Sequence, residues 1–164
     1  MNTPSARFFD EGSHGITIYD GSPDLKATFT ASPYNWLEAS FFYTRIDDLP
    51  YCGDLSDPVC NQSYKDKGFN FKLRLREEDN LPAIAIGAYD FAGTGYYSSE
   101  YIVASYGVGN LDMNFGLGWG NLNGSKFSFK NPLILIDDSF ENRPIEIEDL
   151  LSLIHISEPT RPIR

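Results

Sequence analysis

The chain has 164 residues, enough for one domain, and its 13 Lys and Arg against 23 Asp and Glu give a formal net charge of -10. This acidic balance argues against nucleic-acid binding, which requires a basic surface. No run of 18 apolar residues is present, which argues against a transmembrane helix, whereas 15% aromatic residues and 14 glycines favour curved β-sheet.

Alternation of apolar and polar residues predicts strands in chain order. Successive side chains of a strand point to opposite faces, so an apolar residue at every second position marks one face. The expected strands cover residues 16–19, 25–32, 36–45, 67–76, 83–91, 100–106 and 111–120. Sequential antiparallel pairing is the natural topology. The expected fold class is all-β, an antiparallel up-and-down meander of about seven strands that does not close.

The last two-faced stretch, 111–120, has the clearest pattern. Apolar side chains occupy every odd position, and an acid, an amide and three glycines occupy the even ones. Ten residues is about the length of a tilted strand that crosses a bilayer, ~9–11. Residues 67–76 show the same alternation, with basic residues on the polar face. In an outer-membrane barrel the polar face would line the lumen and the apolar face would meet lipid.

The connections between the predicted strands alternate in length. Those near 32–35, 77–82 and 107–110 are short, and those at the other end include the long stretch 46–66. Short turns at one rim and long loops at the other are typical of outer-membrane barrels. The expected lumen-facing residues are Glu38, Asn70, Lys72, Arg74, Arg76, Glu100, Asp112 and Asn114. The expected lipid-facing residues are Phe69, Phe71, Leu73, Leu75, Leu111, Met113, Phe115, Leu117 and Trp119.

Two cysteines, Cys52 and Cys60, lie in a loop rich in Pro, Gly and Asp. Two interpretations are open: a local disulfide, which requires an oxidising compartment, or two free thiols. No further Cys or His lies nearby to complete a zinc site.

No motif indicates catalysis or a cofactor. The glycines at 93–95 and 116–120 lack the Lys-Ser/Thr of a phosphate-binding loop. The acids at 77–79 and 137–138 are adjacent, whereas catalytic carboxylates face each other across a substrate. His14 stands without a nucleophile motif. We therefore expect neither enzymatic activity nor a cofactor or metal site.

The tail from Leu151 onward differs in kind. Its run LSLIHISEPTR resembles the translation of a sequencing-library adapter, so we expect 151–164 not to be native. The expected organisation is an irregular segment at 1–15, the meander at 16–120 and a loop-rich continuation at 121–150. With no signal peptide and no lipidated cysteine at its start, the chain is expected to be truncated at both ends.

A series of motifs points to a family. These are NTPSAR (2–7), WLEA (36–39) with YT (43–44), KGFNFKLRLR (67–76), PAIAIG (82–87), DFAGTG (90–95), SEYIVAS (99–105) and GLGWG (116–120). In this order, over about residues 2–120, they resemble the YjbH/YbjH family of exopolysaccharide-associated outer-membrane proteins, which is related to the GfcD capsule proteins.

The resemblance implies a Gram-negative outer-membrane β-barrel, often a lipoprotein, that takes part in export or assembly of exopolysaccharide and is not known as an enzyme. Expected partners are outer-membrane lipid, exopolysaccharide and other export proteins, with no nucleic acid. The alternative left open is a soluble β-sandwich or lipocalin-like module that binds a hydrophobic ligand.

Overall fold

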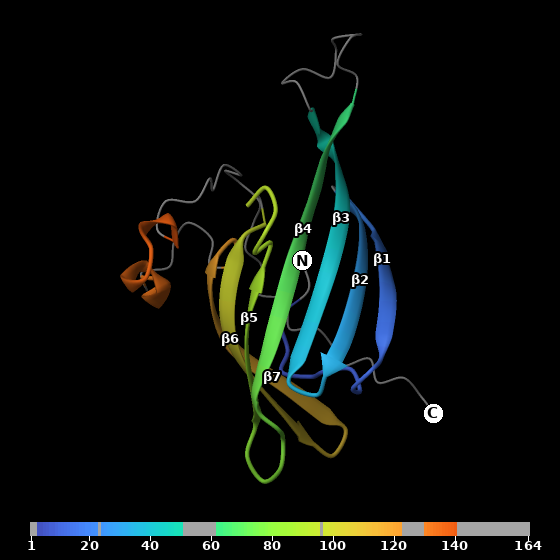
Figure 1. Ribbon diagram of the computed structural model, residues 1–164. Coiled ribbons are helices and arrows are strands. Elements are labelled where there is room, and N and C mark those ends of the chain that lie inside the picture. Colours follow the sequence, from blue (N-terminus) through green and yellow to red (C-terminus); the bar gives the residue numbers. More distant parts are fainter. Residues whose placement is uncertain (1–2, 23, 51–61, 96, 123–129, 141–164) are drawn as a thin grey trace.

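The computed structural model describes residues 3–22, 24–50, 62–95, 97–122 and 130–140. Its strands are β1 (His14–Asp20), β2 (Asp24–Tyr34), β3 (Leu37–Pro50), β4 (Ser63–Arg76), β5 (Ala83–Tyr89), β6 (Ser99–Val108) and β7 (Leu111–Gly120). They form one antiparallel sheet in sequence order, drawn in Figure 1 as a curved, twisted wall. The expected all-β meander of seven strands in one open sheet is confirmed.

Two short 3₁₀ helices, η1 (Pro132–Leu135) and η2 (Asp138–Phe140), follow the sheet. The side chain of Asn131 begins η1 by accepting a hydrogen bond from the Leu133 N–H at 3.0 Å. No helix in the described part of the chain is long and apolar enough to cross a membrane.

The hairpin of β3 and β4 is longer than the sequence pattern predicted. Residues 46–66 were expected to form a loop, yet Ile46 pairs with Tyr64 and Thr44 pairs with Asp66. Charged residues interrupt the apolar period there, but ladder hydrogen bonds come from the backbone and do not need it. The hairpin extends beyond the other strands (Figure 1). Cys52, Cys60 and the tail 151–164 lie outside the described residues.

The two faces of the sheet have opposite polarity. We call the face that carries Phe42, Asn70 and Ser105 the inner face, and the opposite one the outer face. Polar side chains are fully buried on the inner face, where Thr44, Ser99 and Ser105 are each 0% exposed. A water-soluble domain normally buries apolar side chains instead.

Apolar side chains on the outer face are exposed. Ile16, Phe29, Phe41 and Phe69 are successive partners across β1 to β4 and are exposed by 73%, 47%, 39% and 53%. A second row of partners joins Leu37, Leu73, Ile86, Ile102 and Leu117 across β3 to β7. The result is a continuous apolar surface of a kind that marks an interaction site.

The small apolar core lies on the inner face, where residues 3–13, here called the inner segment, cover the sheet. Ala6 packs with Ala83, Ala85, Tyr101 and Val103, and Phe8, Tyr89 and Leu122 pack against this cluster. The Tyr101 ring lies so close to Gly87 that a Cβ at position 87 would overlap it. Glycine therefore allows the ring to lie flat against the wall.

We expect residues 1–164 to aggregate in buffer, because the outer face is apolar and the edge strands β1 and β7 offer unpaired backbone groups. A non-ionic detergent should keep the chain dispersed by covering that face. Size-exclusion chromatography with light scattering checks both conditions. A monodisperse monomer that unfolds cooperatively in buffer alone would contradict this expectation.

Candidate functional site

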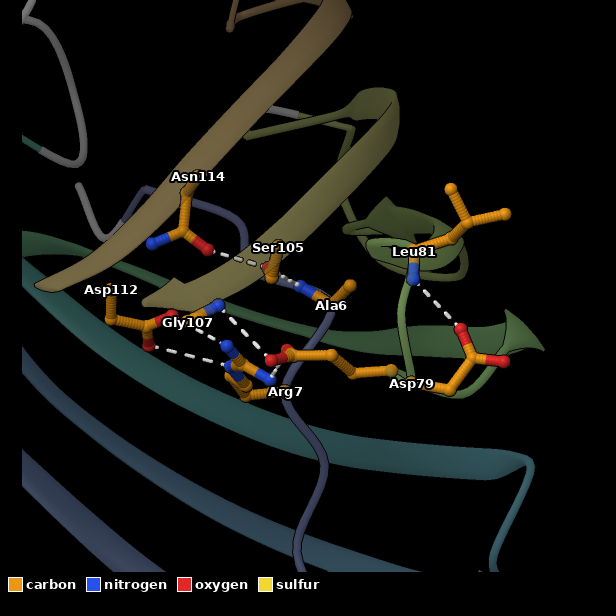
Figure 2. Close-up of polar contacts among 9 residues, drawn as sticks. Ala6, Arg7, Asp79, Leu81, Ser105, Gly107, Asp112 and Asn114 are labelled. Carbon is orange, nitrogen blue, oxygen red and sulfur yellow. Dashed lines mark hydrogen bonds and ion pairs between the residues drawn. The ribbon is translucent and has the colours of Figure 1, made fainter. Parts of the chain in front are cut away.

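The inner segment crosses the inner face and is fixed at both ends. The Ala6 N–H donates to Ser105 Oγ at 2.7 Å, and that hydroxyl donates to Asn114 Oδ1 at 2.6 Å (Figure 2). Near its other end the Gly12 N–H donates to the Ser32 carbonyl at 2.8 Å. The segment therefore reaches from β2 to β6 and β7.

Arg7 connects the inner segment to two parts of the wall. Its guanidinium contacts Asp112 of β7, with Nη2 at 2.5 Å from Oδ1, and also pairs with Glu78 in the turn after β4 (Figure 2). Glu78 in turn accepts the Gly107 N–H at 3.0 Å. The hydrogen bond with Asp112, aided by Glu78, raises the pKa of Arg7 above its already high value. Arg7 is thus a permanent cation between two acids.

Beneath the segment, Glu38 of β3 and Lys72 of β4 form an ion pair of 2.8 Å with side chains only 15% and 13% exposed. The Lys72 ammonium donates to the Arg7 carbonyl at 2.5 Å, and Glu38 accepts the Phe9 N–H at 3.2 Å. Because both charges are paired and also bind the segment, their burial is compensated. The pair joins two strands to the segment above them.

Two cationic side chains lie over the ring of Phe8. Lys72 Nζ lies 4.4 Å and the Arg74 guanidinium carbon 4.5 Å from the ring centroid. Arg74 also contacts Glu77 at 2.8 Å. Cations over an aromatic face are attracted by its quadrupole, so Phe8 helps to seat the segment on β4.

A second polar cluster lies at the opposite rim. Asp90 follows β5 with φ of 51°, accepts the Tyr97 N–H at 3.1 Å and is 3% exposed. Asp66 of β4, 1% exposed, accepts from the Thr94 hydroxyl at 2.6 Å. Asp90 Oδ1 and Asp66 Oδ2 are both buried without a hydrogen bond. Burial is the main cause that raises the pKa of Asp90, and the nearby Asp66 adds to it.

Lys26 of β2 supplies the positive charge of this cluster. Its ammonium lies 4.2 Å from the centroid of Phe42 and 5.0 Å from that of Tyr97. The Tyr97 hydroxyl donates to Asp24 at 3.2 Å. The cluster thus ties the loop after β5 to β2 and β4.

Six of the eight residues expected on the polar face share the inner face by register: Glu38, Asn70, Lys72, Arg74, Asp112 and Asn114. Lys72 reaches Glu38, and Asn70 donates to Ser40 at 2.8 Å. Whether this face lines a lumen stays a prediction.

The expectation is wrong for Glu100 and Arg76. Glu100 pairs with Ala88 and Trp119, and so lies on the outer face, where Asn131 donates to it at 2.9 Å. Arg76 follows a bulge and pairs with Ile84, an outer-face position. A bulge adds one residue and so reverses the alternation, a shift that counting by twos along β4 cannot detect.

Of the nine residues expected to face lipid, eight lie together on the outer face. These eight are placed there by register, and Leu75 lies at the bulge of β4 with 59% exposure. Phe115 and Leu117 are the most exposed of the β7 set, at 67% and 57%. That lipid covers them stays a prediction.

The sequence pattern did not reveal the role of the inner segment. Residues 1–15 have no periodicity, and NTPSAR stood out only as a family motif without an assigned role. The one feature of the sequence that points to a role for this segment is Arg7 beside Phe8 and Phe9 in an otherwise polar stretch. It does not identify Asp112 and Glu78, which are 105 and 71 residues away.

The chemistry available at the inner face is hydrogen bonding and charge pairing. Among the described residues, no group of three or more His, Cys, Asp or Glu could hold a metal ion. A cavity of about 130 Å³ lies between the inner segment and the wall, and Ser5, Ser40, Asn70, Tyr89 and Tyr101 are among its lining residues. Hydroxyl, amide and phenol groups of this kind suit a polar ligand.

Comparisons with known proteins agree with the resemblance seen in the sequence. A family model described as "YjbH: Exopolysaccharide biosynthesis protein YbjH" matches residues 1–150. The chain is 38% identical over 141 residues to a protein of Escherichia coli (strain K12) named "Uncharacterized lipoprotein YjbH". That match covers 85% of this chain and 20% of the relative, so the chain spans about a fifth of the relative's length. No solved structure matches the chain.

We expect Asp90→Asn to keep or raise the free energy of unfolding at pH 7. Asparagine tolerates positive φ and its side-chain oxygen can still accept the Tyr97 N–H, while the buried charge is removed. Because the pKa of Asp90 is raised in the fold, wild-type stability falls as pH rises through that pKa. Thermal unfolding in detergent between pH 4 and 7 should show that this fall is smaller in the variant.

Asp79→Asn is the matched control, because the pKa of Asp79 is lowered in the fold whereas that of Asp90 is raised. The Leu81 N–H donates to Asp79 at 2.8 Å and is the main cause that lowers the pKa of this exposed carboxylate (Figure 2). Its contribution is present at neutral pH and is lost as pH falls. If both variants changed the pH profile in the same direction, the interpretation of Asp90 would be wrong.

Proposed function

Because this chain belongs to the YjbH family of exopolysaccharide biosynthesis proteins, we propose that it forms part of the wall of an outer-membrane β-barrel that serves exopolysaccharide export or assembly. The observation that carries the proposal is the reversed polarity of the sheet, with charged and hydroxyl groups buried inside and apolar rows exposed outside. A barrel wall in lipid requires this arrangement.

Strand length supports a membrane-spanning wall. β6 and β7 have ten residues each, and a tilted spanning strand needs ~9–11. Tyr34 and Trp36 stack with ring centroids 5.4 Å apart where β2 turns into β3 and are about half exposed. Exposed aromatic rings at the strand ends are typical of the interface between lipid and water.

The open edges also fit this proposal. In the described part of the chain, β1 and β7 each pair on one side only. An open seven-stranded sheet needs further strands to close, and the curated relative is about five times longer than the matched stretch. That relative is named a lipoprotein, which fits a Gram-negative cell envelope.

The alternative of a soluble module with a hydrophobic ligand gains no support from the inner face. Such a module requires an apolar interior. Here Asp66 is buried on the inner face and the side chains of Lys72 and Glu38 are only 13% and 15% exposed there, whereas rows of large apolar residues lie exposed on the outer face.

Site-directed spin labelling tests the wall directly. In the full-length protein with native cysteines replaced, labels at Phe29, Phe115 and Leu117 should collide mainly with oxygen, which concentrates in lipid. Labels at Thr28 and Thr30, which flank Phe29 on the inner face, should be protected from oxygen. Equal oxygen collision at Phe29 and its two neighbours, in protein reconstituted in vesicles, would overturn the proposal.

We expect Arg74→Ala in the full-length protein to change polymer export severalfold without lowering barrel levels, because Arg74 lies on the inner face and contacts Phe8. Arg45→Ala is the control, since Arg45 also pairs with an acid, Asp47 at 2.7 Å, but lies exposed on the long hairpin. Secreted polymer is measured beside outer-membrane protein level. Unchanged export by Arg74→Ala at normal barrel level would contradict a role of this face in export.

A further inference from the structure

We propose that the inner segment, residues 3–13, is a removable plug that closes the lumen, with Arg7 as the residue that holds it in place. This inference rests on the proposed function, because a plug requires a barrel. It goes further in assigning a closed state to this structure and in naming the surface that a polymer would use after the plug leaves.

The inner segment lies across the inner face. It contacts β2 through Ser32, β3 through Glu38, β4 through Lys72 and β6 through Ser105, and Arg7 reaches Asp112 of β7. These polar contacts reach five of the seven described strands, and the packing of Ala6 with Ala83 and Ala85 adds β5. A chain lying across the inner face at this width occupies the space through which a solute would pass.

The contacts between the inner segment and the wall are mainly polar. Apart from Ala6 and Phe8, the segment is held by hydrogen bonds and ion pairs, and only its end near Gly12 and Ser13 exchanges backbone hydrogen bonds with β2. Polar contacts can be replaced by water, so the apolar cost of release is limited to the packing of Ala6 and Phe8 on the core cluster. Segments with few buried apolar contacts are those that open at low free-energy cost.

Arg7 lies where it can hold the segment to two parts of the wall. It holds the segment to β7 and to the turn after β4 at once, through Asp112 and Glu78. Loss of its charge would leave two acids without their shared cation on the wall. Hydration of those acids would then favour release of the segment.

The surface beneath the plug suits a hydroxyl-rich polymer. The segment's own backbone uses Lys72, Glu38 and Ser105 as partners, through one carbonyl and two N–H groups. Sugar hydroxyls can both donate and accept, and so can take the same partners once these are free. The adjoining cavity adds Ser40, Asn70 and two tyrosines.

The experiment records ion conductance of the full-length protein in planar lipid bilayers, with potassium chloride as the probe. We expect wild-type channels to be mostly closed and Arg7→Ala to raise the open fraction about tenfold, equivalent to losing ~1.4 kcal/mol of holding interaction. Arg7→Lys should lie between them, because an ammonium keeps the charge but not the fork that reaches both acids. Arg76→Ala should match wild type, since Arg76 pairs with Asp79 and not with a residue of the segment.

If Arg7→Ala leaves the open fraction unchanged in protein with a normal spin-label pattern on the outer face, the plug proposal is overturned and the barrel proposal stands. Loss of the alternating pattern in wild type refutes the barrel itself, so the two failures are distinguishable. If Arg7→Ala does not assemble, Asp112→Asn and Glu78→Gln decide the question. These two variants remove the contacts of Arg7 from the wall side and should raise the open fraction. If both variants conduct like wild type, the proposal is overturned.

Discussion

The ion pair between Glu38 and Lys72 is the contact on which the inner face depends. Each charge is mostly buried, and each is compensated twice, by the other charge and by the backbone of the inner segment. Removing either partner would leave the other charge largely buried with only its hydrogen bond to the segment, which is costly. The pair therefore couples the packing of β3 against β4 to the position of a segment far away in the sequence.

The polarity of the whole sheet follows from the alternation of side chains along its strands. Because side chains alternate, strands that place charged and hydroxyl groups inside must place their remaining residues outside. Among those outer residues, Phe, Leu and Ile form continuous rows. Such rows are unfavourable in water. Membership of an exopolysaccharide biosynthesis family fits the proposal that the sheet is a wall in the cell envelope.

The two rims are built differently. At the rim of short turns, Arg7 and Glu78 join the inner segment to β7 and to the turn after β4 through charges that are partly exposed. At the opposite rim, Asp66 and Asp90 each keep an oxygen buried without a hydrogen bond, beside Lys26. Water can replace the partly exposed ion pairs of Arg7 at low cost, whereas the buried cluster of Asp66 and Asp90 fixes the loop after β5. The proposed movement of the inner segment therefore lies at the rim of Arg7.

The sequence by itself determined the seven strands and their order, because a period of two is a local property of the chain. It located β7 correctly, from Leu111 to Gly120. It could not place Glu100 or Arg76, since the face of a side chain depends on register and on a bulge. It also missed the inner segment, whose partners lie up to 105 residues away. Only tertiary structure brings Arg7 to Asp112, because charge pairing across the sheet leaves no period in the chain.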